Sequence, residues 1–288
     1  MCRNVKIILS RKGFDSSSGG VPSPIFHDGT MISLPIPDRA SMTAYKDIAG
    51  NTFASVGELV HDLAGIPQTH RAHLDPDISA HAILRPEGWR PLFGQVGAAE
   101  KHLENQGVGV GDVFLYFGLF RDVERSGDRW TYVRGSSPIH VVFGWLQVGE
   151  RVAVSNWPDE ATWAFQHPHF QRDSDPTNVL YVGAKHVGLP GLNSLSIPGA
   201  GLFPQFTPAL QLTEPKRRRP SLWLLPQWFH PEGRGSVLTY HGDLSRWRMC
   251  ESGATLDSGA RGQEFVLDCN HYPEATDWLN EVLALTIP

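Results

Sequence analysis

Short hydrophobic runs that end at turn residues predict most of the strands of this chain. Val5–Leu9 is an apolar run followed at once by polar residues, which is typical of a buried strand. Aromatic and β-branched residues dominate Asp112–Phe120, Ile139–Val148 and Asn178–Val182, and these residue types favour strands. Shorter strands are predicted at Thr30–Ile36, Ser221–Leu225, Trp247–Glu251 and Glu264–Cys269. The hairpin-like order of the long runs predicts a central, largely antiparallel sheet.

Helical spacing of apolar positions appears in three segments. Ser55–Leu63 has apolar residues on one face, and Ser55 with Glu58 forms the sequence signature of a capping box. Gly97–Gln106 reads as a second helix. The third helix is expected at about Pro273–Leu285, where proline occupies the first turn. These segments would flank the sheet.

The order of the elements predicts an α+β fold with long N-terminal loops. A PUA-like barrel, as in the EVE and ASCH domains that read modified bases, is an alternative to the open sheet. It is similar to this chain only in pattern, since a Gly-Asp pair precedes one strand and Gly-Trp lies near the end of the next. We expect residues 1–288 to form a single compact domain. A possible subdivision has an N-terminal loop and helix part (1–110), a barrel-like part (111–215) and C-terminal strands with a helix (216–288).

The polar segment Ser10–Asp38 follows the first predicted strand, and loops at strand ends often carry chemistry. It supplies two cations, a carboxylate, three hydroxyls and a glycine pair, namely Arg11, Lys12, Asp15, Ser16, Ser17, Ser18, Gly19 and Gly20. Cations, hydroxyls and backbone amides that a ligand can approach closely suit a phosphate group. The same composition is also typical of a solvated turn.

A second long loop, Gly65–Trp89, is rich in His, Asp and Pro. Asp75 and Asp77, separated by one proline, could act as paired carboxylates for Mg²⁺ or for general-base catalysis, or Asp75 could simply cap an Asp-Pro turn. In the run His70-x-x-His73-x-Asp75, the His-x-Asp pair also resembles the paired ligands of Fe(II)/2-oxoglutarate oxygenases, for which many later histidines could serve as the third ligand. Its place in a proline-rich loop weakens that interpretation.

A third cluster with metal-binding residue types is His167-Pro168-His169. No cysteine or acidic residue stands nearby at ligand spacing, so a surface turn is the expected structure. Cys2, Cys250 and Cys269 lie too far apart in the sequence for a cysteine-based zinc motif or a disulfide framework. We therefore expect no structural metal.

Several segments together resemble the nucleotide modification associated domain 3 family. They are SRKGFDSSSGGVPSPI (10–25), HLDPDI (73–78), FGQVGAAEKHLENQGVGVGDVFLYFG (93–118), HVVFGWLQVGE (140–150) and WLLPQWF (223–229). The resemblance covers nearly the whole chain. It implies a role in phage or bacterial systems that modify DNA bases or nucleotides, and it implies neither a reaction nor a cofactor.

Charge and hydropathy limit the possible partners. The net charge of −5 and the isoelectric point near 6.2 argue against a protein that holds nucleic acid by bulk electrostatics. Only one short basic run, Lys216–Arg219, could contact a nucleic-acid backbone. No apolar span approaches bilayer length, so we expect a cytoplasmic protein without membrane contact. The partner that the family resemblance implies is a nucleotide or a modified base.

Two hypotheses for function follow. In the first, an enzyme transfers a group to a base or nucleotide held by Arg11, Lys12 and the loop of residues 16–20, while Asp15, Asp75 or Asp77 acts as a base or metal ligand. In the second, a non-catalytic PUA-like reader stacks a modified base on Trp145. The charged loops exceed what a reader needs, so the sequence favours the enzyme.

Overall fold

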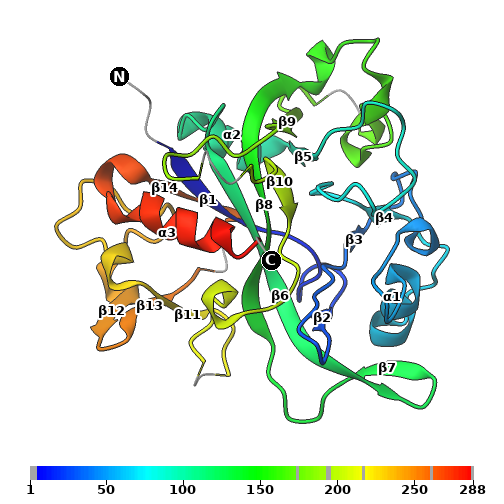
Figure 1. Ribbon diagram of the computed structural model, residues 1–288, viewed down its shortest axis with the longest axis horizontal. Helices are drawn as coiled ribbons and strands as arrows, with labels where there is room; N and C mark the ends of the chain where they lie inside the picture. The colour runs from blue at the N-terminus through cyan, green and yellow to red at the C-terminus, as the bar shows by residue number, and fades with distance from the viewer. Residues whose placement is uncertain (1–4, 173–174, 193–195, 216–217, 260–261, 287–288) are drawn as a thin grey trace.

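A mixed β-sheet crosses the centre of the molecule in the computed structural model, which describes residues 5–172, 175–192, 196–215, 218–259 and 262–286 (Figure 1). Its main strands, in spatial order, are β14 (Glu264–Asp268), β1 (Lys6–Arg11), β6 (Val113–Ser126), β8 (Ile139–Ala153), β9 (Val179–Gly183) and β5 (Leu92–Gln95). Only the β1–β6 pair in this order is parallel. The predicted α+β fold with a largely antiparallel sheet is confirmed. Since β14 and β5 stand at opposite ends of the order, the sheet is open and the barrel alternative is wrong.

Short strands extend this sheet and form two smaller ones. β2 (Ser23–Ile25) and β7 (Arg129–Tyr132) pair with β6, and β10 (Ala200–Leu202) pairs with β8. A three-stranded sheet has the order β11 (Leu222–Leu225), β13 (Gly253–Asp257), β12 (Trp247–Cys250), and a two-stranded one joins β3 (Ile36–Pro37) to β4 (Ala72–His73). The strand predicted at Thr30–Ile36 is wrong except at its end. Residues 31–33 and 35 line a cavity instead, and Pro35 has no N–H for a ladder.

Three α-helices lie where the apolar spacing predicts them: α1 (Val56–Ala64), α2 (Gly97–Asn105) and α3 (Glu274–Ala284). The capping box of α1 is present, because the Glu58 N–H donates to Ser55 Oγ at 3.2 Å and the Ser55 N–H donates to Glu58 Oε2 at 2.8 Å. In Figure 1, α1 and α3 lie on opposite sides of the long strands β6 and β8.

The two long N-terminal loops have a hydrophobic core of their own. Phe14 and Leu34 from the first loop are fully buried with Tyr45 and with Leu59 and Val60 of α1. A separate, larger core surrounds the sheet and includes apolar residues of α2 and α3. The loops are therefore fixed by packing, which allows them to hold side chains in a defined geometry.

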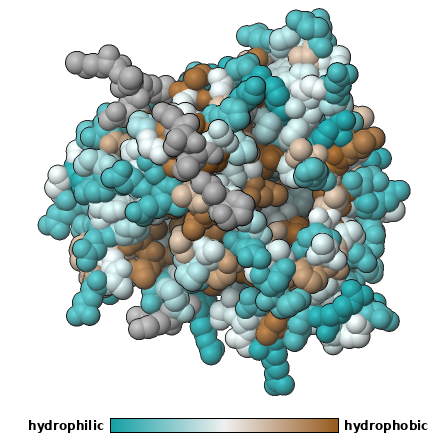
Figure 2. Space-filling model, viewed as in Figure 1, coloured by the Kyte–Doolittle hydropathy of each residue, from teal (hydrophilic) through white to brown (hydrophobic). Residues whose placement is uncertain are grey.

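The pairing of β3 with β4 brings the two loops together. Ile36 pairs with His73, and the Asp38 N–H donates to the Arg71 carbonyl at 3.0 Å. On the face shown in Figure 2, hydrophilic residues predominate and hydrophobic residues are visible in small groups. None of the described helices is both long and apolar enough to span a membrane.

Candidate functional site

A polar cavity of about 300 Å³ lies where the two loops meet the end of the sheet. Residues from distant parts of the chain line it, among them Arg11, Lys12, Asp15, His73, Asp75 and Arg172. The sequence hypothesis that the first loop shares a cleft with residues 73–77 thus matches the geometry at Asp75. The volume is at the lower end of the range of small-molecule sites.

Asp75 lines this cavity, and its side chain is only 5% exposed. Its Oδ1 accepts hydrogen bonds from the Gly94 N–H at 2.9 Å and from His167 Nε2 at 3.2 Å. Its Oδ2 faces His73 Nε2 and His169 Nε2, each 3.7 Å away. Burial opposes ionisation of Asp75, but the hydrogen bond from His167 and the neighbouring His73 imidazole outweigh it and hold the pKa of Asp75 well below its usual value. Asp75 is therefore a buried carboxylate anion.

Each of the two imidazoles that face Asp75 Oδ2 makes a hydrogen bond through its Nδ1 atom. His73 Nδ1 donates to Asp38 Oδ2 at 2.8 Å, and His169 Nδ1 donates to Asn178 Oδ1 at 2.5 Å. Burial lowers the pKa of His169 to about 4, so this ring is neutral at pH 7. Burial also opposes a charge on His73, but Asp38 and Asp75 together raise its pKa. Potential ligand atoms of His73, Asp75 and His169 all lie within 4.8 Å of one another.

Local structure places each of these side chains. His73 is the last residue of β4, and the bond between Asp75 and Pro76 is cis. His169 lies in the short 3-10 helix Pro168–Gln171, whose first residue is a proline. The ring of His169 packs directly on Gly94 of β5, where a Cβ atom would lie 2.3 Å from the ring. A glycine is therefore required beneath His169.

Gly94→Ala should destabilise the protein by about 1–3 kcal/mol, because the added methyl group must push the His169 ring away from Asp75. Chemical denaturation measures the change. Gly188→Ala is the control, since its added Cβ would have an ordinary contact at 3.8 Å. Equal stability of the two variants would show that His169 is not held against Gly94.

The first loop uses much of its polar chemistry to hold its own turn. Asp15 Oδ1 accepts from the Ser17 and Ser18 N–H groups at 2.8 and 2.9 Å and from Ser17 Oγ at 2.6 Å. Gly20 donates its N–H to the Asp15 carbonyl, and Gly19 lies against the Phe14 ring, both glycines having positive φ. Phosphate binding by this loop therefore stays a prediction that depends on its side chains.

The cations of the loop have defined partners. Lys12 Nζ lies 2.7 Å from Oε1 of the buried Glu264, and Arg11 Nη2 donates to the Gly262 carbonyl at 3.1 Å. Both residues still line the polar cavity, and Ser17 and Ser18 line it with them. Ser16 instead lines a neighbouring cavity.

Asp77 and Trp145 are placed away from the polar cavity. The Asp77 carboxylate is buried in an ion pair with Arg85, whose Nη1 lies 2.7 Å from Oδ2, and burial raises the pKa of Asp77. The Trp145 side chain is in the core at 3% exposure, where it packs on Phe203 and donates to the Pro198 carbonyl. This ring offers no open face to a base.

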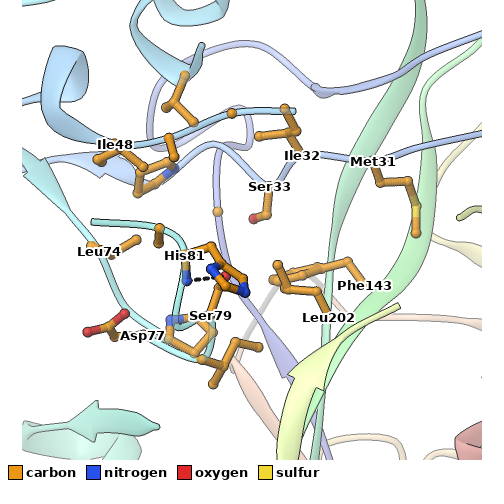
Figure 3. Close-up of a pocket in the computed structure, with 18 of the residues that line it drawn as sticks. Met31, Ile32, Ser33, Ile48, Leu74, Asp77, Ser79, His81, Phe143 and Leu202 are labelled. Carbon is orange, nitrogen blue, oxygen red and sulfur yellow. Dashed lines mark hydrogen bonds between the residues drawn. The ribbon is translucent and has the colours of Figure 1, made fainter. Parts of the chain in front are cut away.

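A second, largely apolar cavity of about 180 Å³ adjoins the first (Figure 3). Met31, Phe143 and Leu202 lie on one side of it in the figure, and Ile48 lies on the other. Gly13 and Asp75 line both cavities. A ligand with one apolar and one charged end could therefore occupy both, with Asp75 beside the junction.

These features define an α+β protein with a buried carboxylate–imidazole centre between a polar and an apolar cavity. The chain belongs to the nucleotide modification associated domain 3 family, whose model matches residues 6–268. It is thus a protein associated with nucleotide modification. Comparisons with curated proteins and with solved structures found no match.

Sequence reasoning missed His169, Asn178 and Arg172 as parts of the site. The interpretation of His167-Pro168-His169 as a surface turn is wrong, since both histidines are 2% exposed. The acidic partner absent from the local sequence is Asp75, about ninety residues earlier in the chain. The signal in the sequence for this joint site was a pair of incomplete metal-binding motifs, at residues 73–75 and 167–169.

None of the described residues of the basic run Lys216–Arg219 lines the polar cavity. Arg219 pairs with Asp257, their closest atoms 2.5 Å apart, while Lys216 and Arg217 lie outside the described residues.

Proposed function

We propose that this protein is an enzyme that modifies a base or nucleotide at the Asp75 centre. The observation that supports this most directly is the polar cavity, where a buried carboxylate anion and two imidazoles lie beside guanidinium groups. Perturbed carboxyl and imidazole pKa values in a cleft are typical of catalytic sites. Family membership supports a substrate of the nucleotide class.

The two cavities suit the two ends of a nucleotide. Arg11 and Arg172 in the polar cavity can contact a phosphate, because a guanidinium presents a planar array of donors that matches phosphate oxygens. The apolar cavity beside Phe143 can take the base. Asp75, which lines both cavities, would then lie next to the reacting part of the ligand, as acid–base chemistry or metal coordination requires.

The reader hypothesis is less well supported. Its stacking platform, Trp145, is buried in the core, and its barrel is replaced by an open sheet. A binding module also has no need for a buried carboxylate anion surrounded by three histidines, since burial of the charge costs desolvation energy. A cavity of this kind can serve a free nucleotide or a base flipped out of DNA.

Arg172→Ala should weaken nucleotide binding about tenfold or more, the effect of losing one charge-assisted hydrogen bond. Titration of nucleoside monophosphates and of short oligonucleotides across a salt series measures it. Arg90→Ala is a matched control, because the Arg90 and Arg172 side chains are similarly exposed, at 41% and 39%, and each lies near a carboxylate. Arg90 pairs with Glu150, and Arg172 Nη2 lies 3.5 Å from Asp38 Oδ2, but only Arg172 lines the polar cavity. We expect a shallow salt dependence for the wild type. A steep dependence without preference for any base, or an equal loss in both variants, would contradict the proposal.

A further inference from the structure

We propose that His73, Asp75 and His169 bind a divalent first-row transition metal ion, with Nε2, Oδ2 and Nε2 as the ligand atoms. The arrangement has the donor set of two imidazoles and one carboxylate that holds catalytic iron(II) and zinc in proteins. The role in catalysis rests on the proposed function, whereas the binding of the ion does not.

Hydrogen-bond partners fix the tautomers that a metal requires. A carboxylate oxygen can only accept, so His73 Nδ1 carries a proton for Asp38. Asn178 Nδ2 donates to the His169 carbonyl at 2.9 Å, which orients the amide so that Oδ1 accepts from His169 Nδ1. Once Nε2 carries no proton, as when a metal ion displaces it, a ring protonated on Nδ1 has its lone pair on Nε2, and both Nε2 atoms face Asp75. Such carboxylate and carbonyl partners behind a histidine are typical of metal ligands.

The spacing at the centre fits an ion better than a hydrogen bond. Each Nε2 lies 3.7 Å from Asp75 Oδ2, which is too long for a hydrogen bond. Ligand atoms at about 2 Å from a shared ion lie roughly 3–3.5 Å apart, so a small rotation of the side chains completes the site. His167 differs, because its Nε2 is 3.2 Å from Oδ1 and its Nδ1 accepts from the His169 N–H at 3.4 Å. His167 therefore orients the carboxylate and is not a ligand.

The site leaves room for further ligands. His73, Asp75 and His169 all line the polar cavity, so water or a substrate oxygen can reach the remaining coordination positions. Sites with three protein ligands and open positions are catalytic rather than structural. Nitrogen donors favour zinc, iron or cobalt over magnesium, which prefers oxygen ligands.

Calorimetric titration of the chelator-treated chain with Co(II), Zn(II) and Mg(II) tests the proposal. We expect one Co(II) or Zn(II) per chain and much weaker Mg(II) binding. His73→Gln and His169→Gln should each weaken Zn(II) binding at least about 100-fold, because each removes a direct ligand, beyond the range reported for outer-shell changes. His70→Gln is the matched control, since His70 lies three residues from His73 and is exposed.

X-ray absorption spectroscopy of the zinc-loaded wild type identifies the ligands of the ion directly, so it tests the proposal even if a variant fails to fold. Two imidazole nitrogens at about 2.0–2.1 Å are expected around the ion. Absence of stoichiometric binding, an unchanged affinity in both ligand variants, or a coordination shell without imidazole would overturn the metal site. Nucleotide titration of the metal-free chain is scored separately, so failure of the metal site and failure of the nucleotide site can be told apart.

Discussion

Asp75→Asn should reduce turnover by about 10²–10⁴-fold and change nucleotide binding by no more than about threefold. A general base or metal ligand acts mainly in the transition state, so its loss lowers the rate far more than the affinity. The amide is nearly the same size as the carboxylate and can still accept from the Gly94 N–H. The loss should thus be chemical rather than structural.

Turnover is measured by mass spectrometry of nucleotides and of digested DNA after incubation with the wild type and the variant, with Zn(II) or Fe(II) supplied. Asp112→Asn is the control, because Asp112 is also buried and also accepts from backbone N–H groups, those of Lys6 and Gly109, but lines neither cavity. Product formation at the wild-type rate by Asp75→Asn would place the chemistry elsewhere.

Arg85→Met should destabilise the folded protein by about 3–5 kcal/mol, because it leaves the buried Asp77 carboxylate without its ion-pair partner. The methionine chain can still pack on the Trp89 ring, which the guanidinium now covers. Most of the loss is therefore electrostatic.

The stability lost in Arg85→Met should also depend on pH. Burial raises the pKa of Asp77 above its unfolded value even with Arg85 present, so the folded state binds this proton more tightly than the unfolded state. The stability that this proton contributes is present at low pH and is lost as pH rises through the folded pKa. Without Arg85 the pKa rises further, and the deficit of the variant should shrink as the pH falls from neutral.

Urea denaturation of the wild type and Arg85→Met at several pH values measures both effects. Arg90→Met, which breaks the exposed pair with Glu150, should cost less than about 1 kcal/mol at every pH. A deficit for Arg85→Met that is as small as this, or that grows on acidification, would show that Asp77 does not carry a buried charge.

The fold could be predicted from the sequence wherever local signals were strong. The capping box at Ser55 and Glu58 and the aromatic runs of β6 and β8 correctly placed a helix and the central strands. The cavity around Phe143 could not be predicted in this way. Residues 31–33 and 35 fall within the strand predicted at Thr30–Ile36, yet they line that cavity, and the strand observed there is only Ile36–Pro37.

The site was predictable in part. Arg11 and Asp75 lie in one cavity as expected from the two charged loops. The partnership of Asp75 with His169 depends on tertiary packing, since β5 carries Gly94 beneath the ring and no local pattern links residues so far apart. Aromatic character alone could not decide between a stacking surface and the core for Trp145, which packs in the core, the commoner position for tryptophan.

A crystal structure of the protein with Mn(II) and a nucleoside monophosphate tests the central claim most directly. The account predicts an anomalous peak at the meeting point of His73 Nε2, Asp75 Oδ2 and His169 Nε2, with the phosphate beside Arg11 and Arg172 and the base in the apolar cavity. A nucleotide bound outside both cavities, with Asp75 out of contact with ligand and ion, would contradict it.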